Sequence, residues 1–237
     1  MAQKQVSKKN IKFSIPTDVA SLDTTILTDQ YSYDVAGNVE EGLTRVDSKG
    51  NAALALAKSI DVSKDGLTYT VTLRDNLKWS NGDKLTAKDF VYSWKRAVDP
   101  KTGSEYAYLM GAVSGANDII SGKSSLDSLG IKAESDTEFK VTLAQPTPYF
   151  KFLLSEPVYY PLDQKVVDKY GKQYGTSSDK TVYNGPFMFK SDKGWTGTNK
   201  TFSIYANPNY YDKSAVKSKQ IDFQVISNAN TGAQLYK

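Results

Sequence analysis

The chain has 237 residues, and its 30 Lys and Arg against 26 Asp and Glu give a formal net charge of +4. Hydrophobic residues make up 39% of the chain, which is typical of globular proteins and allows one large core or two smaller ones. The absence of His and Cys excludes a Ser-His-Asp triad, a Cys-His nucleophile, a zinc site with His or Cys ligands and a disulfide. The small positive excess is spread along the chain, so no nucleic-acid partner is predicted.

The sequence contains no candidate membrane span. Its longest purely apolar run, Ala52–Ala57, is far shorter than the ~20 residues that cross a bilayer. Met1–Asn10 has neither the apolar region of a signal peptide nor a Cys that could carry a lipid. We therefore expect any membrane tether to be a lipid anchor that this chain lacks.

The first third of the chain contains the clearest secondary-structure patterns. Alternation predicts a strand over Ile11–Ile15, and apolar spacing predicts a short helix from about Tyr33 to Gly42. Leu67–Leu73 alternates apolar residues with Thr, which is typical of a half-buried strand. Thr86 and Asp89 form a variant of the capping box, which predicts a helix that runs to Asp99-Pro100.

The rest of the chain alternates helix and strand patterns without a strict βαβ rhythm. A helix is predicted over Tyr106–Ile120, loosened by Gly111 and Gly115, and a short buried helix within Tyr149–Tyr160. Strands are predicted over Phe139–Leu143, Phe187–Phe189, Phe202–Tyr205 and Ile221–Ile226. The fold class is therefore α/β with mixed α and β elements.

Carboxylates are the remaining route to catalysis or metal binding. Asp61–Gly66 begins like a calcium loop, but Thr72 stands where a bidentate Glu is required, so a turn is the better interpretation. Glu40 and Glu41 are interpreted as a solvated helix face rather than an acid-base pair. No metal site and no cofactor are predicted, and a carboxylate-dependent glycan hydrolase stays open as an alternative function.

The 16 tyrosines suggest a tolerant binding surface, because a phenol combines a flat apolar face with a polar tip. Tyr69 and Tyr205 lie in strand patterns and are expected in the core. The tyrosines in or near loops are the candidates for ligand contact: Tyr31, Tyr33, Tyr106, Tyr108, Tyr159 and Tyr160.

The stretch Asp65–Pro100 strongly resembles the signature of the extracytoplasmic oligopeptide-binding proteins of ABC importers. Shorter matches extend the resemblance over nearly the whole chain: Ser21–Asp23, Glu41–Leu43, Leu129–Ala133, Pro148–Phe150, Tyr183–Phe187 and Asn207–Tyr211. The resemblance implies a type 2 periplasmic-binding-protein fold, in which lobes close over a peptide and deliver it to a membrane ABC permease without chemistry.

The resemblance also implies how the lobes are divided. Residues 1–41 would begin the first lobe, residues 42–162 would form a small inserted lobe, and residues 163–237 would continue the first lobe. Members of the family continue into a third lobe and a closing C-terminal segment that this chain lacks, so a partial fold is expected. The bare sheet edge that would result leads us to expect self-association.

The resemblance implies ligand-binding residues only where this sequence matches the family's motifs. The loop after Ser21–Asp23 points to Thr28, Asp29, Gln30 and Tyr31, and the tyrosine after Asp99-Pro100 is Tyr106. Asn184 and Gly185 match an Asn-Gly element near the lobe junction, although turn formation explains them equally well. The same fold binding a signalling peptide or another small solute is a further alternative, and the expected location is the cell surface, by a lipid anchor, or the periplasm.

Overall fold

The computed structural model describes residues 11–190 and 194–227. They form three sheets and five α-helices, joined by loops and short 3₁₀ segments. The strands are β1 (Ile11–Ile15), β2 (Thr44–Val46), β3 (Ala52–Leu54), β4 (Ala57–Val62), β5 (Thr68–Leu73), β6 (Ile131–Ala133), β7 (Glu138–Thr142), β8 (Phe187–Phe189), β9 (Thr201–Ala206) and β10 (Gln220–Val225). The helices are α1 (Gln30–Val39), α2 (Ala87–Val98), α3 (Ala116–Ile120), α4 (Phe150–Leu153) and α5 (Gln164–Tyr170).

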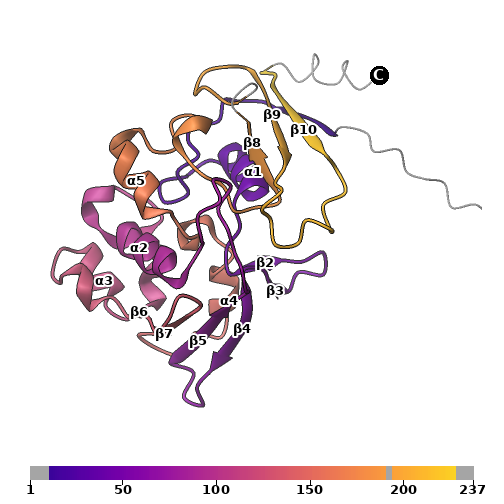
Figure 1. Cartoon of the computed structure of the whole chain (residues 1–237). Coiled ribbons are helices and arrows are strands. Elements are labelled where there is room, and N and C mark those ends of the chain that lie inside the picture. Colours follow the sequence, from indigo (N-terminus) through magenta and orange to yellow (C-terminus); the bar gives the residue numbers. More distant parts are fainter. Residues whose placement is uncertain (1–10, 191–193, 228–237) are drawn as a thin grey trace, which may run out of the picture.

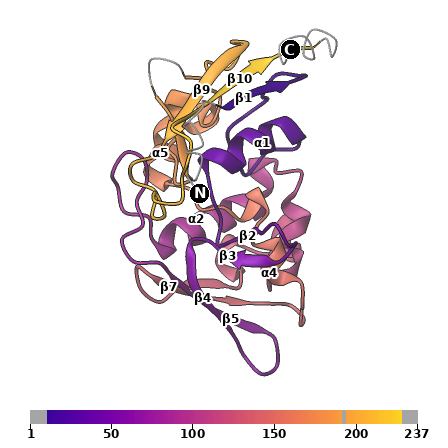
Figure 2. The ribbon, with the colours of Figure 1, turned by 90° about the vertical axis from the view of Figure 1, so that its right-hand side faces the viewer.

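One four-stranded sheet combines the beginning and the end of the described chain. Its order is β1-β10-β9-β8, with β1 parallel to β10 and the other neighbours antiparallel. Helix α1 lies against this sheet (Figure 2). The core between them contains Val35 and Val39 of α1 together with Phe202, Ile204 and Phe223 of the sheet. The predicted strand Ile11–Ile15 is confirmed within the described residues.

A second four-stranded sheet, of order β4-β5-β7-β6, is antiparallel throughout and lies at the opposite end of the molecule (Figure 1). In β5 the side chains of Tyr69, Val71 and Leu73 are buried, as the alternation in the sequence predicts. Helix α2 buries Phe90 and Trp94 in the same core. Its first turn is capped, because the Thr86 N–H donates a hydrogen bond to Asp89 Oδ2 at 2.7 Å. The predicted strand and helix are therefore confirmed.

The helix predicted over Tyr106–Ile120 is wrong as a single element. The segment consists of a 3₁₀ stretch, Ala107–Ala112, followed by α3. The break lies at Gly115, whose φ of 81° is left-handed and whose Cβ, if it had one, would lie 2.4 Å from the Ser128 carbonyl oxygen. The close approach of these two backbones requires glycine and stops a continuous helix.

Two large hydrophobic clusters form the interior of the described chain. One gathers residues between Leu43 and Val182 around the β4-β5-β7-β6 sheet, and the other gathers residues around the β1-β10-β9-β8 sheet. A third, small cluster of Leu162, Val167 and Tyr174 adjoins Tyr92 of α2. Within the described residues no helix is both long and apolar enough to cross a membrane.

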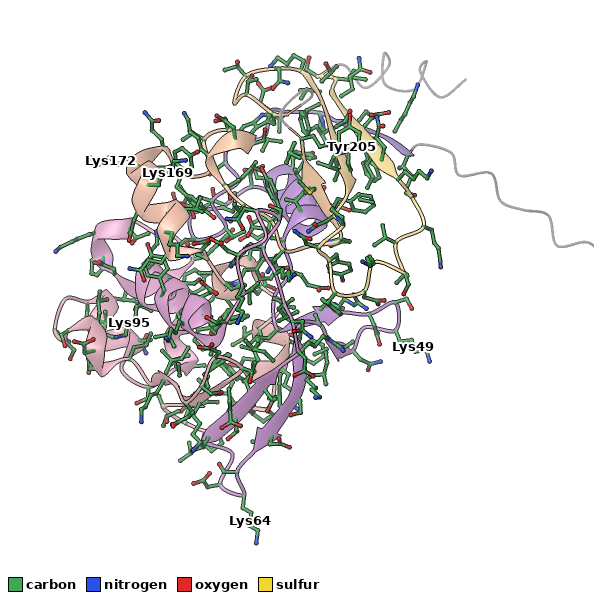
Figure 3. All side chains as sticks on the ribbon, in the orientation of Figure 1. Lys49, Lys64, Lys95, Lys169, Lys172 and Tyr205 are labelled. Atoms are coloured by element: carbon green, nitrogen blue, oxygen red, sulfur yellow. The ribbon has the colours of Figure 1, made fainter. Side chains whose placement is uncertain are left out.

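The lysines labelled in Figure 3 lie on different parts of the surface. Figure 3 shows Lys64 at the tip of the β4–β5 hairpin, Lys49 beside the β2–β3 hairpin, and Lys169 and Lys172 near α5 on another side of the molecule. The labelled lysines do not form one stripe, which agrees with the dispersed charge expected from the sequence.

Candidate ligand-binding site

The loop that leads into α1 is fixed from two directions. The Leu22 N–H donates to the Gly175 carbonyl at 2.8 Å. The buried Asp23 carboxylate accepts two hydrogen bonds from the Arg96 guanidinium of α2, at 2.9 and 2.6 Å. A bidentate Arg–carboxylate pair fixes the orientation of the loop relative to α2 as well as its distance. The loop is therefore held by a helix that lies more than seventy residues away in the sequence.

The N-terminus of α1 carries free backbone donors. Asp29 is the N-cap, and its Oδ1 accepts from the N–H groups of Tyr31 and Ser32 at 3.1 and 2.9 Å. Among the described residues, the backbone N–H groups of Thr28, Asp29 and Gln30 have no hydrogen-bond acceptor. Three adjacent donors at a helix N-terminus are suited to carbonyl or carboxylate oxygens of a ligand.

Tyr106 lies beside this loop. Its hydroxyl approaches the Thr28 carbonyl at 3.5 Å, and the neighbouring Ser104 hydroxyl donates to the Thr25 carbonyl at 2.6 Å. The Tyr106 ring also contacts Tyr33 of α1, with a centroid separation of 6.2 Å. The structure thus brings Tyr106 next to Thr28, which precedes it by 78 residues in the sequence, and to the neighbouring Asp29.

Gln30 and Tyr31 lie on α1 next to the same loop but differ in exposure. The exposed Gln30 side chain donates to Asp34 Oδ1 at 2.8 Å, along the helix. Tyr31 is half-buried and packs against the core of the β1-β10-β9-β8 sheet. The Gln30 side chain is therefore exposed but bonded along the helix, whereas part of the Tyr31 ring packs against the core.

Asn184 and Gly185 lie in a buried junction. The Asn184 side chain accepts from the Glu41 N–H at 2.9 Å and donates to the Glu41 carbonyl at 3.1 Å. The Gly185 N–H donates to the Val39 carbonyl at 2.9 Å, and a Cβ there would lie 2.7 Å from the Glu40 nitrogen. The structure brings both residues to the segment that follows α1, not to the Tyr106 cluster, and uses the Asn184 amide to hold that segment.

Glu40 and Glu41 contradict the interpretation as a solvated helix face, because only 2% and 7% of their surfaces are exposed. Helix α1 ends at Val39, so both residues enter the junction with Asn184 rather than extending the helix. Burial raises the pKa of Glu40 well above its usual range, with Asp23 adding to the rise. Burial also raises the pKa of Glu41, although Arg45 and the Tyr210 hydroxyl lower it in part.

The long-range pairs are the part of the site that the sequence reasoning missed. Asp23 with Arg96, and Asn184 with Glu41, join segments that no local pattern relates. Apart from its match to the resemblance, Asp23 has no signal in the sequence beyond being an acidic residue next to a buried Leu22. Among the described residues, no group of three or more Asp and Glu is placed to hold a metal ion.

A family model describes most of this chain. The model of the bacterial extracellular solute-binding proteins, family 5, middle part, matches residues 51–237. A dipeptide-binding protein of Lactococcus lactis subsp. cremoris is 96% identical over 234 residues, which cover 99% of this chain and 42% of that protein. The oligopeptide-binding protein OppA of Bacillus subtilis is 40% identical over 224 residues, which cover 94% of this chain and 40% of that protein.

Solved structures agree with the fold. OppA of Listeria monocytogenes bound to peptide superimposes with a TM-score of 0.93 at 41% identity, covering 97% of this chain and 45% of that chain. The pheromone receptor PrgZ, in a structure that describes its mode of peptide binding, gives a TM-score of 0.92 at 41% identity, with the same coverage. The chain spans less than half the length of these relatives, and its mixed α/β fold corresponds to that part of their chains.

Proposed function

The chain belongs to the bacterial extracellular solute-binding proteins of family 5, and we propose that it captures peptides for delivery to an ABC permease. The observation that carries the proposal is the convergence of three free backbone N–H groups at Thr28–Gln30 with the side chain of Tyr106. The dipeptide-binding relative and the peptide-bound OppA structure support peptides as the ligand class.

The proposed mode of binding reads the peptide mainly through its backbone. A row of main-chain donors recognises carbonyl oxygens, which every peptide carries, and therefore tolerates different side chains. Exposed tyrosines add contact area at a low cost in side-chain entropy. Thr28, Asp29 and Gln30 would supply the main-chain contacts, and Tyr106, together with the exposed part of Tyr31, would pack against the ligand.

Asn184 and Gly185 are proposed to act on the same site through the backbone. They hold Glu41 and Val39 at the C-terminal end of α1, while Asp29 and the free N–H groups lie at its N-terminal end. In this role they are positioning residues that do not touch the peptide.

The lobe boundaries are also part of the proposal. A first lobe of residues 1–41 and 163–237, with residues 42–162 inserted, is supported by the two large clusters of the core, although Val182 belongs to the cluster of the inserted residues. Tyr92 and Val167 pack α5 against α2, which would make the contact between the two lobes continuous. The ligand would then lie on a face shared by both, where the Thr28 loop meets Tyr106.

Membership of the family suggests several further properties of the natural protein that contains these residues. It would act as a binding protein without catalysis, outside the cytoplasmic membrane, either at the cell surface through a lipid anchor or in the periplasm. Additional chain would complete the cleft and hold the charged ends of the peptide. The predictions for residues 1–10 lie outside the described residues.

Self-association of this chain is proposed through β1, which lies at the edge of its sheet. Phe13 is 52% exposed and Ile11 is 40% exposed on this strand. An edge strand with exposed apolar side chains offers both backbone and apolar contacts to a second copy. Light scattering across a concentration series should show a mass that rises with concentration, and a constant monomer mass would contradict this.

A signalling peptide is the second candidate ligand, because the pheromone receptor PrgZ is as similar in sequence as the Listeria OppA structure. The glycan hydrolase has less support, since Glu40 and Glu41 are buried at a junction and the similar proteins above are named for binding.

Calorimetry separates these candidates. The natural chain is titrated with unrelated peptides of two to six residues, and the proposal expects several of them to bind with comparable affinity. Tight binding of a single sequence would favour a signal receptor, and hydrolysis of glycans without peptide binding would overturn the proposal.

A further inference from the structure

Three tyrosines form a partly exposed cluster next to the free N–H groups. Tyr33 comes from α1, and Tyr106 and Tyr108 come from the loop and 3₁₀ segment after α2. The ring centroids of Tyr33 and Tyr106 are 6.2 Å apart, and those of Tyr106 and Tyr108 are 6.0 Å apart. Tyr108 is 64% exposed, so the cluster presents aromatic surface to solvent.

Two carboxylates lie near this tyrosine cluster: Asp29 caps α1, and Glu156 directly precedes the 3₁₀ segment Pro157–Tyr159, which packs against both α1 and the segment Ala107–Ala112. Asp29 Oδ2 is buried and has no hydrogen-bond partner within the described residues, although Oδ1 caps α1. The partly buried Glu156 carboxylate has neither a hydrogen bond nor an ion pair in the described part of the chain. Because the charge of Asp29 is partly offset by the helix N-terminus, Glu156 is the less compensated of the two.

The charged groups next to the tyrosine cluster, Asp29 and Glu156, are both acidic. Burial raises the pKa of Tyr33, and the nearby carboxylates of Glu156 and Asp29 raise it further because each carries negative charge. Burial raises the pKa of Glu156. Aromatic faces and unpaired carboxylates both attract organic cations.

We propose that Tyr33, Tyr106, Tyr108 and Glu156 form a subsite for the basic side chain, lysine or arginine, of a peptide bound along Thr28–Gln30. The proposal rests on the proposed function, since the peptide backbone must lie at the free N–H groups. Side chains of an extended strand alternate between its two faces, so one of them points towards a group placed beside the strand. Tyr106 is such a group, because its hydroxyl approaches the Thr28 carbonyl.

A neutral side chain fits the subsite less well. An apolar group would gain contact with the rings but would further desolvate the Glu156 carboxylate without supplying a partner, which is unfavourable. A lysine or arginine side chain gains the same ring contact through its stem and places its charge near the carboxylate. The subsite therefore favours peptides with a lysine or arginine at this position, although binding through the peptide backbone accepts many sequences.

The test compares peptides that differ only in charge. The natural chain is titrated with Ala-Lys-Ala, with its norleucine analogue, and with the N-acetylated forms of both. The lysine peptide should bind about 5- to 30-fold more tightly than the norleucine peptide, with or without N-acetylation. Equal affinity of the two peptides, or a preference that depends only on the free N-terminal amine, would overturn the subsite.

Substitutions locate the preference in the molecule. Glu156→Gln should reduce the lysine-to-norleucine ratio several-fold, because the lysine peptide loses its charged partner and the norleucine peptide no longer desolvates a carboxylate. Tyr108→Phe should retain more of the ratio than Tyr108→Leu. Glu134→Gln and Tyr149→Leu are the matched controls, since Glu134 pairs with Lys132 and Tyr149 is 60% exposed outside the cluster. A ratio that is unchanged in Glu156→Gln contradicts the proposal.

The outcomes for the subsite and for the proposed function remain distinct. If no peptide binds to the natural chain at all, the proposed function fails. If peptides bind but charge has no effect, only the subsite fails. Thermal unfolding of every variant verifies that a loss of the ratio does not come from a loss of the fold.

Discussion

Two groups of aromatic side chains have similar ring geometry but very different environments. In the core between α2 and the β4-β5-β7-β6 sheet, Trp94 meets Tyr159 edge-on at 5.0 Å, and both are fully buried. In the tyrosine cluster, Tyr106 meets Tyr108 edge-on at 6.0 Å, and Tyr108 is 64% exposed. The comparison shows that burial, rather than ring geometry, separates aromatic residues that stabilise the fold from those available to a ligand.

The polar atoms make the same distinction. Trp94 Nε1 donates to the Tyr159 carbonyl at 2.9 Å, and the Tyr159 hydroxyl donates to the Leu109 carbonyl at 2.7 Å. The core group therefore satisfies its polar atoms internally. The Tyr106 hydroxyl has only a long contact of 3.5 Å to the Thr28 carbonyl, which leaves it free to exchange this partner for a ligand.

The largest expected effect is the loss of a buried ring. Trp94→Ala should lower the free energy of unfolding by about 3–5 kcal/mol, because it removes a fully buried aromatic side chain and leaves a cavity. Urea unfolding followed by circular dichroism measures the change. Tyr108→Ala, as the exposed control, should stay within about 0.5 kcal/mol of the wild type. Equal losses in the two variants would contradict the comparison.

A smaller but clear effect is expected at the junction that holds α1. Asn184→Ala leaves the N–H and carbonyl of the buried Glu41 without their side-chain partners, which should cost about 2 kcal/mol of stability. Denaturant unfolding compares it with Asn38→Ala, a partly exposed asparagine of α1 whose side chain donates to the Asp34 carbonyl, which should change little. If both variants unfold alike, the amide of Asn184 does not hold the junction.

The buried Glu40 should make stability depend on pH. Because its pKa is raised in the folded chain, the folded state retains a proton that the unfolded state releases once the pH exceeds the usual glutamate range. The contribution of Glu40 is therefore most favourable at low pH and is lost as the pH rises towards the raised pKa. Glu40→Gln, which is neutral at every pH, should gain stability relative to the wild type between pH 5 and pH 8.

This test must consider the groups that face Glu40 from each neighbouring segment. Tyr160, Tyr174 and Tyr183 are influenced by it, and Asp23 with its partner Arg96 lies alongside. None of the three phenols titrates between pH 5 and pH 8, because burial raises the pKa of each. A stability difference between Glu40→Gln and the wild type that stays constant over this range would show that Glu40 does not retain its proton.

The smallest effect on stability, with the clearest effect on binding, is expected at Tyr106. Tyr106→Ala should leave the melting temperature nearly unchanged, since the ring is only half-buried, but should weaken peptide binding about 10-fold. Calorimetry and thermal unfolding of the same samples measure both. Unaltered affinity would remove Tyr106 from the site, and a large loss of stability would place it with Trp94.

Local patterns in the sequence predicted the elements that depend on local rules. The alternation in Thr68–Leu73 and the capped, amphipathic α2 follow from the periods of strand and helix, and both were found close to their predicted bounds. The prediction of one continuous helix after Tyr106 was wrong because the Gly115 backbone packs against Ser128. Helix periodicity in the sequence carries no information about such a tertiary contact.

Only part of the candidate site could be predicted from the sequence. The loop at Thr28–Tyr31 and Tyr106 came from the resemblance, and the structure brings Thr28 and Tyr106 into contact. The burial of Glu40 and Glu41 could not be inferred, because two adjacent charged residues are typical of a solvated surface and their partners lie in distant segments. The role of Asn184 depends on such a long-range contact as well.

Amide hydrogen exchange tests most directly whether the peptide lies at the N-terminus of α1. In the natural chain without ligand, the unbonded N–H groups of Thr28, Asp29 and Gln30 should exchange rapidly. With saturating peptide, exchange should slow at these residues and remain unchanged at the Ser63–Gly66 turn, which is far from them in the sequence. Unchanged exchange at Thr28–Gln30 in a chain that calorimetry shows to be saturated with peptide would contradict the account.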